Sequence, residues 1–81
     1  MDGYNIATDI VGNRYVSTAM IPTFVSAFGG YAKTCETLIW EWDGEKRGKR
    51  LHGINLPNEE VAAKFHGRIV AYLRKKEAAE C

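Results

Sequence analysis

Two histidines and two cysteines are the residues of this 81-residue chain that could hold a metal ion or act as nucleophiles. They are His52, His66, Cys35 and Cys81. A structural zinc site draws its ligands from close pairs such as C-x₂-C or H-x₃₋₅-H, and these four residues form no such pair. We therefore predict that the chain has no metal site. We interpret His66 as a residue at the boundary of the core that makes one hydrogen bond.

Nucleophilic and acid–base chemistry lack a suitable arrangement as well. A Cys–His pair would need Cys35 beside a histidine, but pairing about a turn at Gly44–Gly48 sets Cys35 near residue 57, beyond His52. The neighbouring acidic residues alternate between the two faces of a strand and form no general acid–base pair: Glu36, Glu41, Asp43 and Glu45. We therefore predict that the protein is not an enzyme, with no catalytic residue and no cofactor.

A basic run follows the apolar stretch "ETLIWEW". It is "DGEKRGKR", residues 43–50, and its four cations are Lys46, Arg47, Lys49 and Arg50. Three interpretations stay open: phosphate contacts made by a hairpin, a contact with an acidic patch on a protein, and a solvated turn. Asp43 and Glu45 partly neutralise the run, and few aromatic residues are free to stack on bases.

The composition predicts one soluble domain that spans residues 1–81. Hydrophobic residues make up 46% and charged residues 26% of the chain, and the net charge is +1. This balance argues against a general polyanion binder and against an acidic mimic of DNA. The sequence has no apolar run long enough to span a membrane and no secretory signal, so we expect a cytoplasmic protein. Two distant cysteines favour free thiols over a disulfide.

Alternating and β-branched residues predict four strands. We expect them at Tyr4–Val11, Arg14–Ile21, Thr34–Trp42 and residues 49–56. Gly12 and Asn13 would close a tight hairpin between the first two strands, and Pro22 would end the second. On the first strand we predict that the even-numbered positions form the apolar side.

A C-terminal helix completes an α+β fold of the order ββββα, in which the helix packs on one face of a four-stranded antiparallel sheet. We expect the helix to begin near Pro57, with Asn55 or Leu56 as its N-cap. Its apolar stripe would comprise Val61, Phe65, Ile69, Tyr72 and Leu73. The sheet would present Leu38, Trp40 and Trp42 to it, so that Trp40 packs against Phe65 and Ile69.

The segment from residue 22 to residue 30 is harder to interpret. It carries Phe24, Val25 and Phe28, but Gly29 and Gly30 break any regular element. We predict an irregular connection. The sequence leaves open whether its aromatic residues cap the core or stand exposed as part of a binding surface.

The stretches "YVSTAMIP", "ETLIWEW" and "EEVAAKFHGRIV", in this order, resemble pieces of small proteins encoded by phages and prophages. The resemblance covers roughly residues 15–73. It implies a non-enzymatic phage or mobile-element protein that binds and blocks a host protein, most sharply an anti-CRISPR-like inhibitor of a host defence nucleoprotein complex. The alternative is a small nucleic-acid-binding or virion accessory protein that uses the basic run.

These expectations place the protein in the host cytoplasm as a monomer or weak dimer. Its main partner would be a protein, with direct nucleic-acid contact secondary. The predicted partner-binding residues are Lys46, Arg47, Lys49, Arg50, Phe24, Val25 and Phe28.

Overall fold

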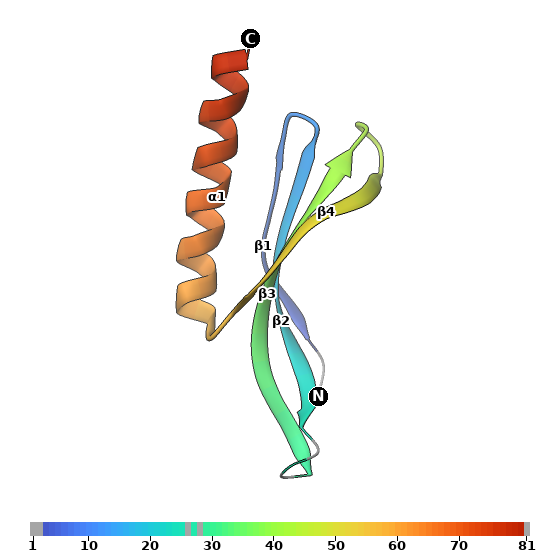
Figure 1. Ribbon diagram of the computed structural model, residues 1–81, viewed down its shortest axis with the longest axis vertical. Coiled ribbons are helices and arrows are strands. Elements are labelled where there is room, and N and C mark those ends of the chain that lie inside the picture. Colours follow the sequence, from blue (N-terminus) through green and yellow to red (C-terminus); the bar gives the residue numbers. More distant parts are fainter. Residues whose placement is uncertain (1–2, 26, 28, 81) are drawn as a thin grey trace.

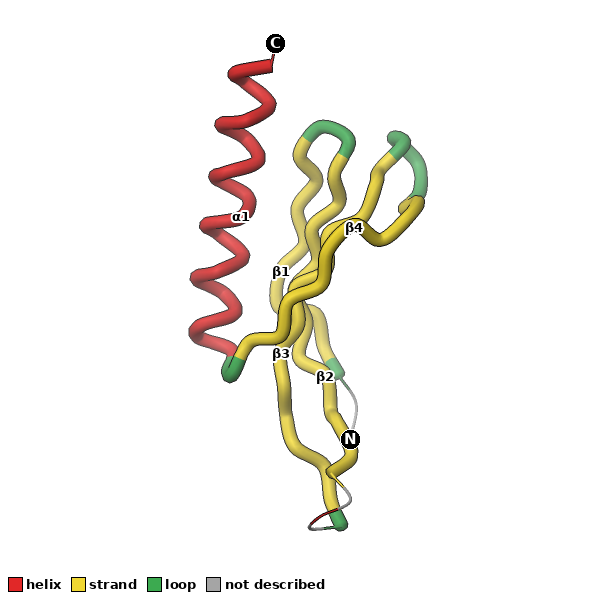
Figure 2. Tube along the Cα trace, viewed as in Figure 1, coloured by secondary structure: helices red, strands yellow, loops and turns green. Residues whose placement is uncertain are grey.

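One antiparallel sheet and one helix make up the fold, as the sequence predicts. The computed structural model describes residues 3–25, 27 and 29–80. The strands lie in the order β1-β2-β3-β4, and α1 runs along one face of the sheet (Figures 1 and 2). The elements are β1 (Tyr4–Val11), β2 (Arg14–Val25), β3 (Gly30–Trp42), β4 (Arg47–Leu56) and α1 (Glu59–Glu80).

The first hairpin turns at Gly12 and Asn13. Val11 pairs with Arg14, so the turn has two residues. Gly12 has a φ of 59°, whereas no residue other than glycine has a positive φ in the described part of the chain. A glycine with positive φ at the first central position is typical of a type II′ turn, whose twist matches that of the strands.

Pro22 does not end β2, contrary to the sequence-based prediction. It pairs with Lys33, and the strand continues to Val25, while β3 begins at Gly30 rather than at Thr34. The Pro22 Cδ atom lies 3.4 Å from the position that a Cβ would take on Gly3. The imino nitrogen therefore faces the β1 side of the sheet, where Pro22 removes no hydrogen bond between β2 and β3.

The helix covers the opposite face of the sheet from the predicted one. On β3 the buried residues are Cys35, Thr37 and Ile39, whereas Leu38, Trp40 and Trp42 are half-buried on the other face. The predicted packing of Trp40 against Phe65 and Ile69 is therefore wrong. Small side chains explain the choice of face, because they let the helix axis approach the sheet closely.

The core between α1 and the sheet is built on Met20, Cys35 and Ala62. Ala62 is completely buried, and Ile6 and Leu56 pack around this cluster. The methyl group of Ala62 takes up little space between α1 and the sheet, which leaves room for the side chains of the sheet.

A bulge in β1 overturns the expected alternation of that strand. The register moves from Asn5 opposite Ala19 to Ala7 opposite Thr18, so Ile6 is the extra residue. An extra residue shifts every later side chain to the other face. Ile10 is consequently 48% exposed on the face away from α1.

The helix is capped by Asn58 rather than by Asn55 or Leu56. The Asn58 Oδ1 atom accepts a hydrogen bond of 2.9 Å from the Val61 amide, which is an N-cap contact. The most buried helical positions are Ala62, His66 and Val70, whereas two residues of the predicted stripe, Val61 and Tyr72, are 40% and 61% exposed.

The far ends of β2 and β3 project beyond the rest of the sheet. Pairing with β1 reaches only as far as Met20, and pairing with β4 ends at Cys35. The pairs from Ile21–Thr34 to Val25–Gly30 thus form a two-stranded extension, seen at the bottom of Figure 1, which we call the β2–β3 arm.

The arm replaces the predicted irregular connection. Phe24 and Val25 belong to its first strand, and Phe28 lies outside the described residues. The arm gives the molecule an elongated shape, with extents of 51, 24 and 16 Å.

Candidate protein-binding surface

Aromatic side chains gather on the sheet face that α1 leaves uncovered. Tyr15 of β2 pairs with Trp40 of β3, and Trp42 of β3 pairs with Arg47 of β4. Residues opposite each other in antiparallel strands project to the same face. We call Tyr15, Trp40, Trp42 and Arg47 the aromatic face.

The members of the aromatic face contact one another through their ring faces. The rings of Tyr15 and Trp42 stack with centroids 5.4 Å apart and planes 30° apart. The Arg47 guanidinium lies 5.0 Å from the centroid of the Trp40 ring and 5.4 Å from that of Tyr15. Both distances fall within the range of cation–π contacts. The Trp40 Nε1 atom is buried and has no hydrogen-bond partner among the described residues.

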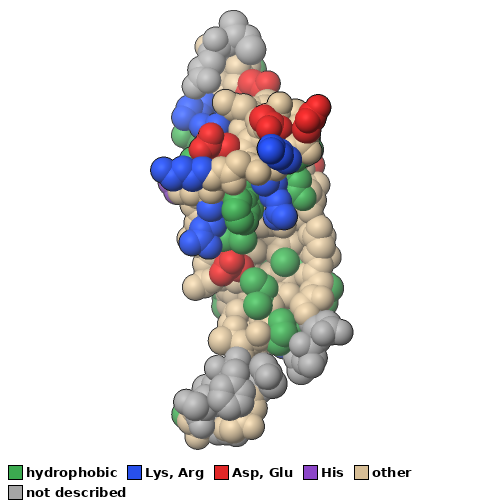
Figure 3. All heavy atoms as spheres, turned by 90° about the vertical axis from the view of Figure 1, so that its right-hand side faces the viewer, with side chains coloured by type: hydrophobic (Ala, Val, Ile, Leu, Met, Phe, Trp, Pro, Cys, Tyr) green, Lys and Arg blue, Asp and Glu red, His purple; other side chains and the backbone are tan. Residues whose placement is uncertain are grey.

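Aliphatic side chains extend this surface. Ile10 pairs with Tyr15, and Leu38 pairs with Gly53. A Cβ on Gly53 would lie only 3.2 Å from the Leu38 Cδ2 atom, so the glycine makes room for that side chain. Figure 3 shows hydrophobic side chains in the middle of the face away from α1, with charged side chains of both signs around its upper part.

The basic run forms an ordered turn beside the aromatic face. The Asp43 Oδ1 atom accepts hydrogen bonds of 2.8 Å from the backbone amides of Glu45 and Lys46. These two amides, Lys46 first, hold the pKa of the Asp43 carboxyl below its ordinary value. Gly44 has a φ of 101°, a conformation that favours glycine. We call residues 43–50, which comprise this turn and the start of β4, the basic tip.

The predicted partner-binding residues do not form one surface. Arg47 lies on the aromatic face, and Arg50 pairs with Trp40 next to it. Lys46 and Lys49 are exposed at the same tip. Phe24 and Val25 lie in the β2–β3 arm, at the other end of the molecule in Figure 1.

Sequence reasoning did not predict that α1 leaves the aromatic face uncovered. The alternation along β3 shows that Trp40 and Trp42 share a face, but it does not show which face the helix covers. The small residue Ala62 at one of the most buried helical positions was the available signal. It indicates that the helix approaches the sheet closely at this position.

His66 belongs to a buried polar chain that joins α1 to the sheet. Its Nδ1 atom lies 2.7 Å from the Thr18 hydroxyl, which lies 2.7 Å from that of Thr37. Its Nε2 atom lies 2.8 Å from Asp9 Oδ2. A carboxylate only accepts, so Nε2–H donates to Asp9. When the ring is neutral, the Thr18 hydroxyl donates to Nδ1 and the Thr37 hydroxyl donates to Thr18. His66 thus makes two hydrogen bonds rather than the one predicted.

The Thr18 hydroxyl, the His66 imidazole and the Asp9 carboxylate follow one another in the order of a nucleophilic triad. The Thr18 hydroxyl, however, is not accessible to solvent. Thr18 and Thr37 are completely buried, and His66 is 4% exposed. A substrate cannot reach the Thr18 hydroxyl while α1 lies on the sheet. We therefore interpret these hydrogen bonds as contacts that position the helix.

The other candidate ligands and nucleophiles lie apart. Cys35 is buried and pairs with Leu56, whereas His52 pairs with Ile39. Within residues 3–25, 27 and 29–80, no group of three or more His, Cys, Asp or Glu residues could hold a metal ion. In the same part of the chain, no helix has the length and apolar character needed to cross a membrane.

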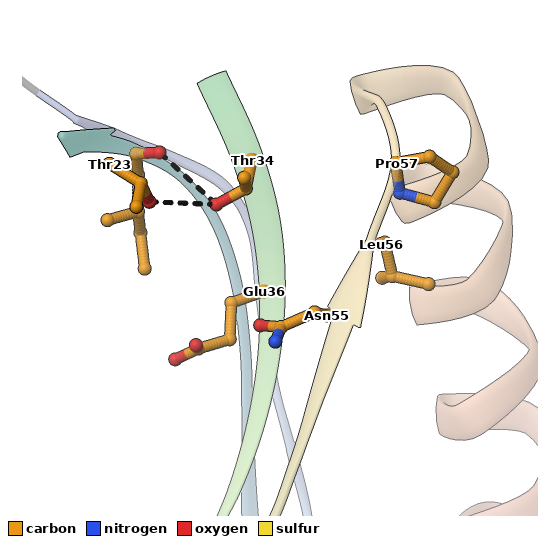
Figure 4. Close-up of a pocket in the computed structure, with 7 residues that line it drawn as sticks. Thr23, Thr34, Glu36, Asn55, Leu56 and Pro57 are labelled. Carbon is orange, nitrogen blue, oxygen red and sulfur yellow. Dashed lines mark hydrogen bonds between the residues drawn. The ribbon is translucent and has the colours of Figure 1, made fainter. Parts of the chain in front are cut away.

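A shallow pocket of about 500 Å³ lies beside the notch where β4 leaves the edge of β3, and it extends over β3 to β2. Its lining residues are Ile21, Thr23, Thr34, Glu36, Asn55, Leu56 and Pro57. Figure 4 shows β3 with Thr34 on one side of this notch, and Leu56 and Pro57, which lead into α1, on the other. The Thr34 hydroxyl donates to the carbonyl oxygen of Ile21 at 3.4 Å and lies 3.3 Å from the Thr23 hydroxyl.

Comparison of the chain with protein-family models, with curated proteins and with solved structures finds no match.

Proposed function

We propose that this protein is a non-enzymatic binding protein that captures another protein with its aromatic face and basic tip. The observation that carries the proposal is the cluster of Tyr15, Trp40, Trp42 and Arg47 on a sheet face that α1 does not cover. Tryptophan, tyrosine and arginine are the residues most enriched at the energetic centres of protein–protein interfaces.

The cluster is preorganised for binding. The guanidinium of Arg47 rests on two rings, and Tyr15 stacks on Trp42. Side chains that already hold their bound conformations lose less entropy when a partner arrives. The surrounding cations Lys46, Lys49 and Arg50 favour a partner whose matching surface is acidic.

Nucleic-acid binding is the second candidate, and the exposed cations of the basic tip favour it. Binding to single strands also needs free ring faces on which bases stack. Here Tyr15 and Trp42 cover each other, and Arg47 occupies a face of Trp40. A base would have to displace these contacts, so a protein partner fits the arrangement better.

The resemblance to small phage and prophage proteins sharpens the proposal. In this version the protein works in the cytoplasm of a bacterial host and blocks a host defence nucleoprotein complex, in the manner of an anti-CRISPR. An aromatic centre with the cations Lys46, Lys49 and Arg50 beside it suits an acidic protein surface that lies next to bound nucleic acid.

Affinity capture with matched charge reversals tests the proposal. Tagged wild type, Arg47→Glu and Lys75→Glu are incubated with a bacterial lysate, each with and without nuclease. Lys75 is an exposed residue of α1, so its reversal changes the net charge equally without touching the aromatic face. We expect a protein that wild type and Lys75→Glu retain after nuclease treatment and that Arg47→Glu loses.

Binding measurements with the purified partner then give the size of the effect on affinity. Arg47→Glu should weaken its binding by roughly 30-fold or more, as expected for the loss of a central contact of about 2 kcal/mol. Equal capture by wild type and Arg47→Glu would refute the aromatic face as the binding site. Recovery of nucleic acid alone, lost after nuclease, would support the second candidate.

A further inference from the structure

The β3 edge of the β2–β3 arm carries backbone groups that no strand of the described chain pairs with. Pairing with β4 ends at Cys35, so residues 30–34 form an open edge. An open edge offers N–H and C=O groups to any strand that can align with it.

The register shows which residues point their backbone groups outward. The Trp42 amide donates to the Asn13 carbonyl on the β2 side. Backbone groups alternate along a strand, and β3 pairs with β2 in unbroken register. The even-numbered residues of β3 therefore bond to β2. Tyr31 and Lys33 direct their N–H and C=O groups to the open edge.

The opposite edge of the arm is less suited to pairing. There the outward positions are Pro22 and Phe24, and the Pro22 ring faces the β1 side next to Gly3. Proline has no N–H to donate, so a strand added at this edge would lose one hydrogen bond. The arm is therefore open to a new strand on its β3 edge.

We propose that this edge pairs with the same edge of a second copy of the chain, antiparallel and about a twofold axis at Ala32. In this register Lys33 of one copy faces Tyr31 of the other, and each such pair exchanges two backbone hydrogen bonds. The outward backbone groups of Tyr31 and Lys33 in both copies are then satisfied. A register centred on Lys33 would instead set two positive charges opposite each other, which is unfavourable.

The notch fits the end of a second arm. Residues 30–34 form the open part of the β3 edge, and they are also the β3 strand of the arm. In the dimer, residues 30–34 of each copy therefore lie in the notch of the other copy, in line with the β4 strand of that other copy. Gly30 would then face Thr34 of the other copy. The next pair of this register would set Gly29 opposite Cys35, which already pairs with Leu56, so the arm must turn away at Gly29, whose φ is 61°. Glycines bring no side chain to the pocket beside Leu56 and Pro57, so the strand ends can approach closely.

Site-specific disulfide formation tests the register. In a Cys81→Ser background, which leaves the buried Cys35 unchanged, Ala32→Cys places two thiols at the twofold axis. Directly opposed residues of a non-hydrogen-bonded pair have Cα atoms about 4.5 Å apart, within disulfide reach. We expect rapid formation of a covalent dimer under mild oxidation. In the control Lys33→Cys, the two thiols lie on a diagonal about 7–8 Å apart, and the cross-link should form at least tenfold more slowly.

Sedimentation velocity of the full chain provides an independent measurement. The average mass should rise toward twice the monomer mass between about 10 μM and 1 mM, because so short a strand pair buries less than a standard interface. Lys33→Pro, which removes an outward N–H, should stay monomeric, whereas Lys33→Thr should still dimerise.

A monomer throughout this range would overturn the proposal, as would equal cross-linking of the two cysteine variants. Dimerisation of Lys33→Pro as strong as that of Lys33→Thr would overturn it too. The aromatic face lies outside the arm, so these outcomes do not depend on those of the partner-capture experiment.

Discussion

The imidazole of His66 lies 2.8 Å from the carboxylate of Asp9, so the middle of α1 is fastened to β1 at the boundary of the core. Two further hydroxyls continue this chain into β2 and β3. The contact sets the position of the helix along the sheet, because an apolar helix could slide without a large change in buried area, whereas a buried hydrogen-bond chain is satisfied at one position.

Removal of the imidazole should destabilise the protein strongly. His66→Ala leaves the Thr18 hydroxyl without its acceptor and opens a cavity, so the free energy of unfolding should fall by about 2–4 kcal/mol. Urea denaturation measures this value. The control Arg68→Ala changes an exposed residue of the same helix. If His66→Ala lowered the free energy of unfolding by less than about 0.5 kcal/mol, the hydrogen bonds of His66 would not hold the helix in place.

The tautomer of His66 can be observed directly. The contacts require a proton on Nε2 and none on Nδ1 of the neutral ring. Long-range ¹H–¹⁵N NMR spectra at neutral pH should therefore show the Nε2–H form. The Nδ1–H form would reverse the direction of the hydrogen bonds through Thr18 and Thr37.

Two neighbouring alanines of α1 should respond in opposite ways to a larger side chain. Ala62 is completely buried against Met20 and Cys35, whereas Ala63 is exposed. Ala62→Leu should cost about 1–3 kcal/mol of stability through overpacking, and Ala63→Leu should change it by less than about 0.5 kcal/mol. Thermal or urea unfolding compares the pair. Equal effects would show that α1 does not approach the sheet at Ala62.

The position of Arg47 over two rings should contribute to stability. Arg47→Met retains a long side chain and removes the cation, and it should lower the free energy of unfolding by about 0.5–1 kcal/mol. Lys49→Met removes the same charge from the same tip, and no cation–π contact of Lys49 is found among the described residues. Its stability should stay within experimental error of wild type. A larger loss for Lys49→Met would refute the cation–π contact.

The stability of the turn at Asp43 should depend on pH in the acidic range. Hydrogen bonds from the Lys46 and Glu45 amides lower the pKa of the Asp43 carboxyl in the folded protein. The stability contribution is therefore complete above the unfolded pKa of about 3.9 and is lost as the pH falls through the lower, folded pKa. Carboxyl ¹³C NMR should show a lower titration midpoint for Asp43 in the native protein than in urea. Equal midpoints would contradict the turn.

Local chemistry alone predicted the elements and their order. The glycine at position 12 closes a hairpin with the required positive φ, and the alternation of Thr34–Trp42 makes a strand. These features depend on residues a few positions apart, so the sequence carries them directly. The ββββα fold and the chain positions of the basic tip followed from them.

The tertiary structure decided which face of the sheet is covered. A period of two assigns Trp40 and Trp42 to one face and Thr37 and Ile39 to the other, but it does not say which face the helix takes. That choice depends on how closely α1 approaches, which the methyl of Ala62 sets from a distant part of the chain. The aromatic face is left uncovered by α1 for this reason.

Two further outcomes depended on contacts across the sheet. The bulge at Ile6 reversed the exposed side of β1, and Pro22 continued β2 because its imino nitrogen faces an edge where no hydrogen bond is lost. Residue type shows that proline cannot donate, but only the pairing of strands shows whether a donor is needed at that position. The sequence by itself therefore determined the number and order of the elements, and the three-dimensional packing determined how far β2 and β3 extend and which surfaces remain free to bind.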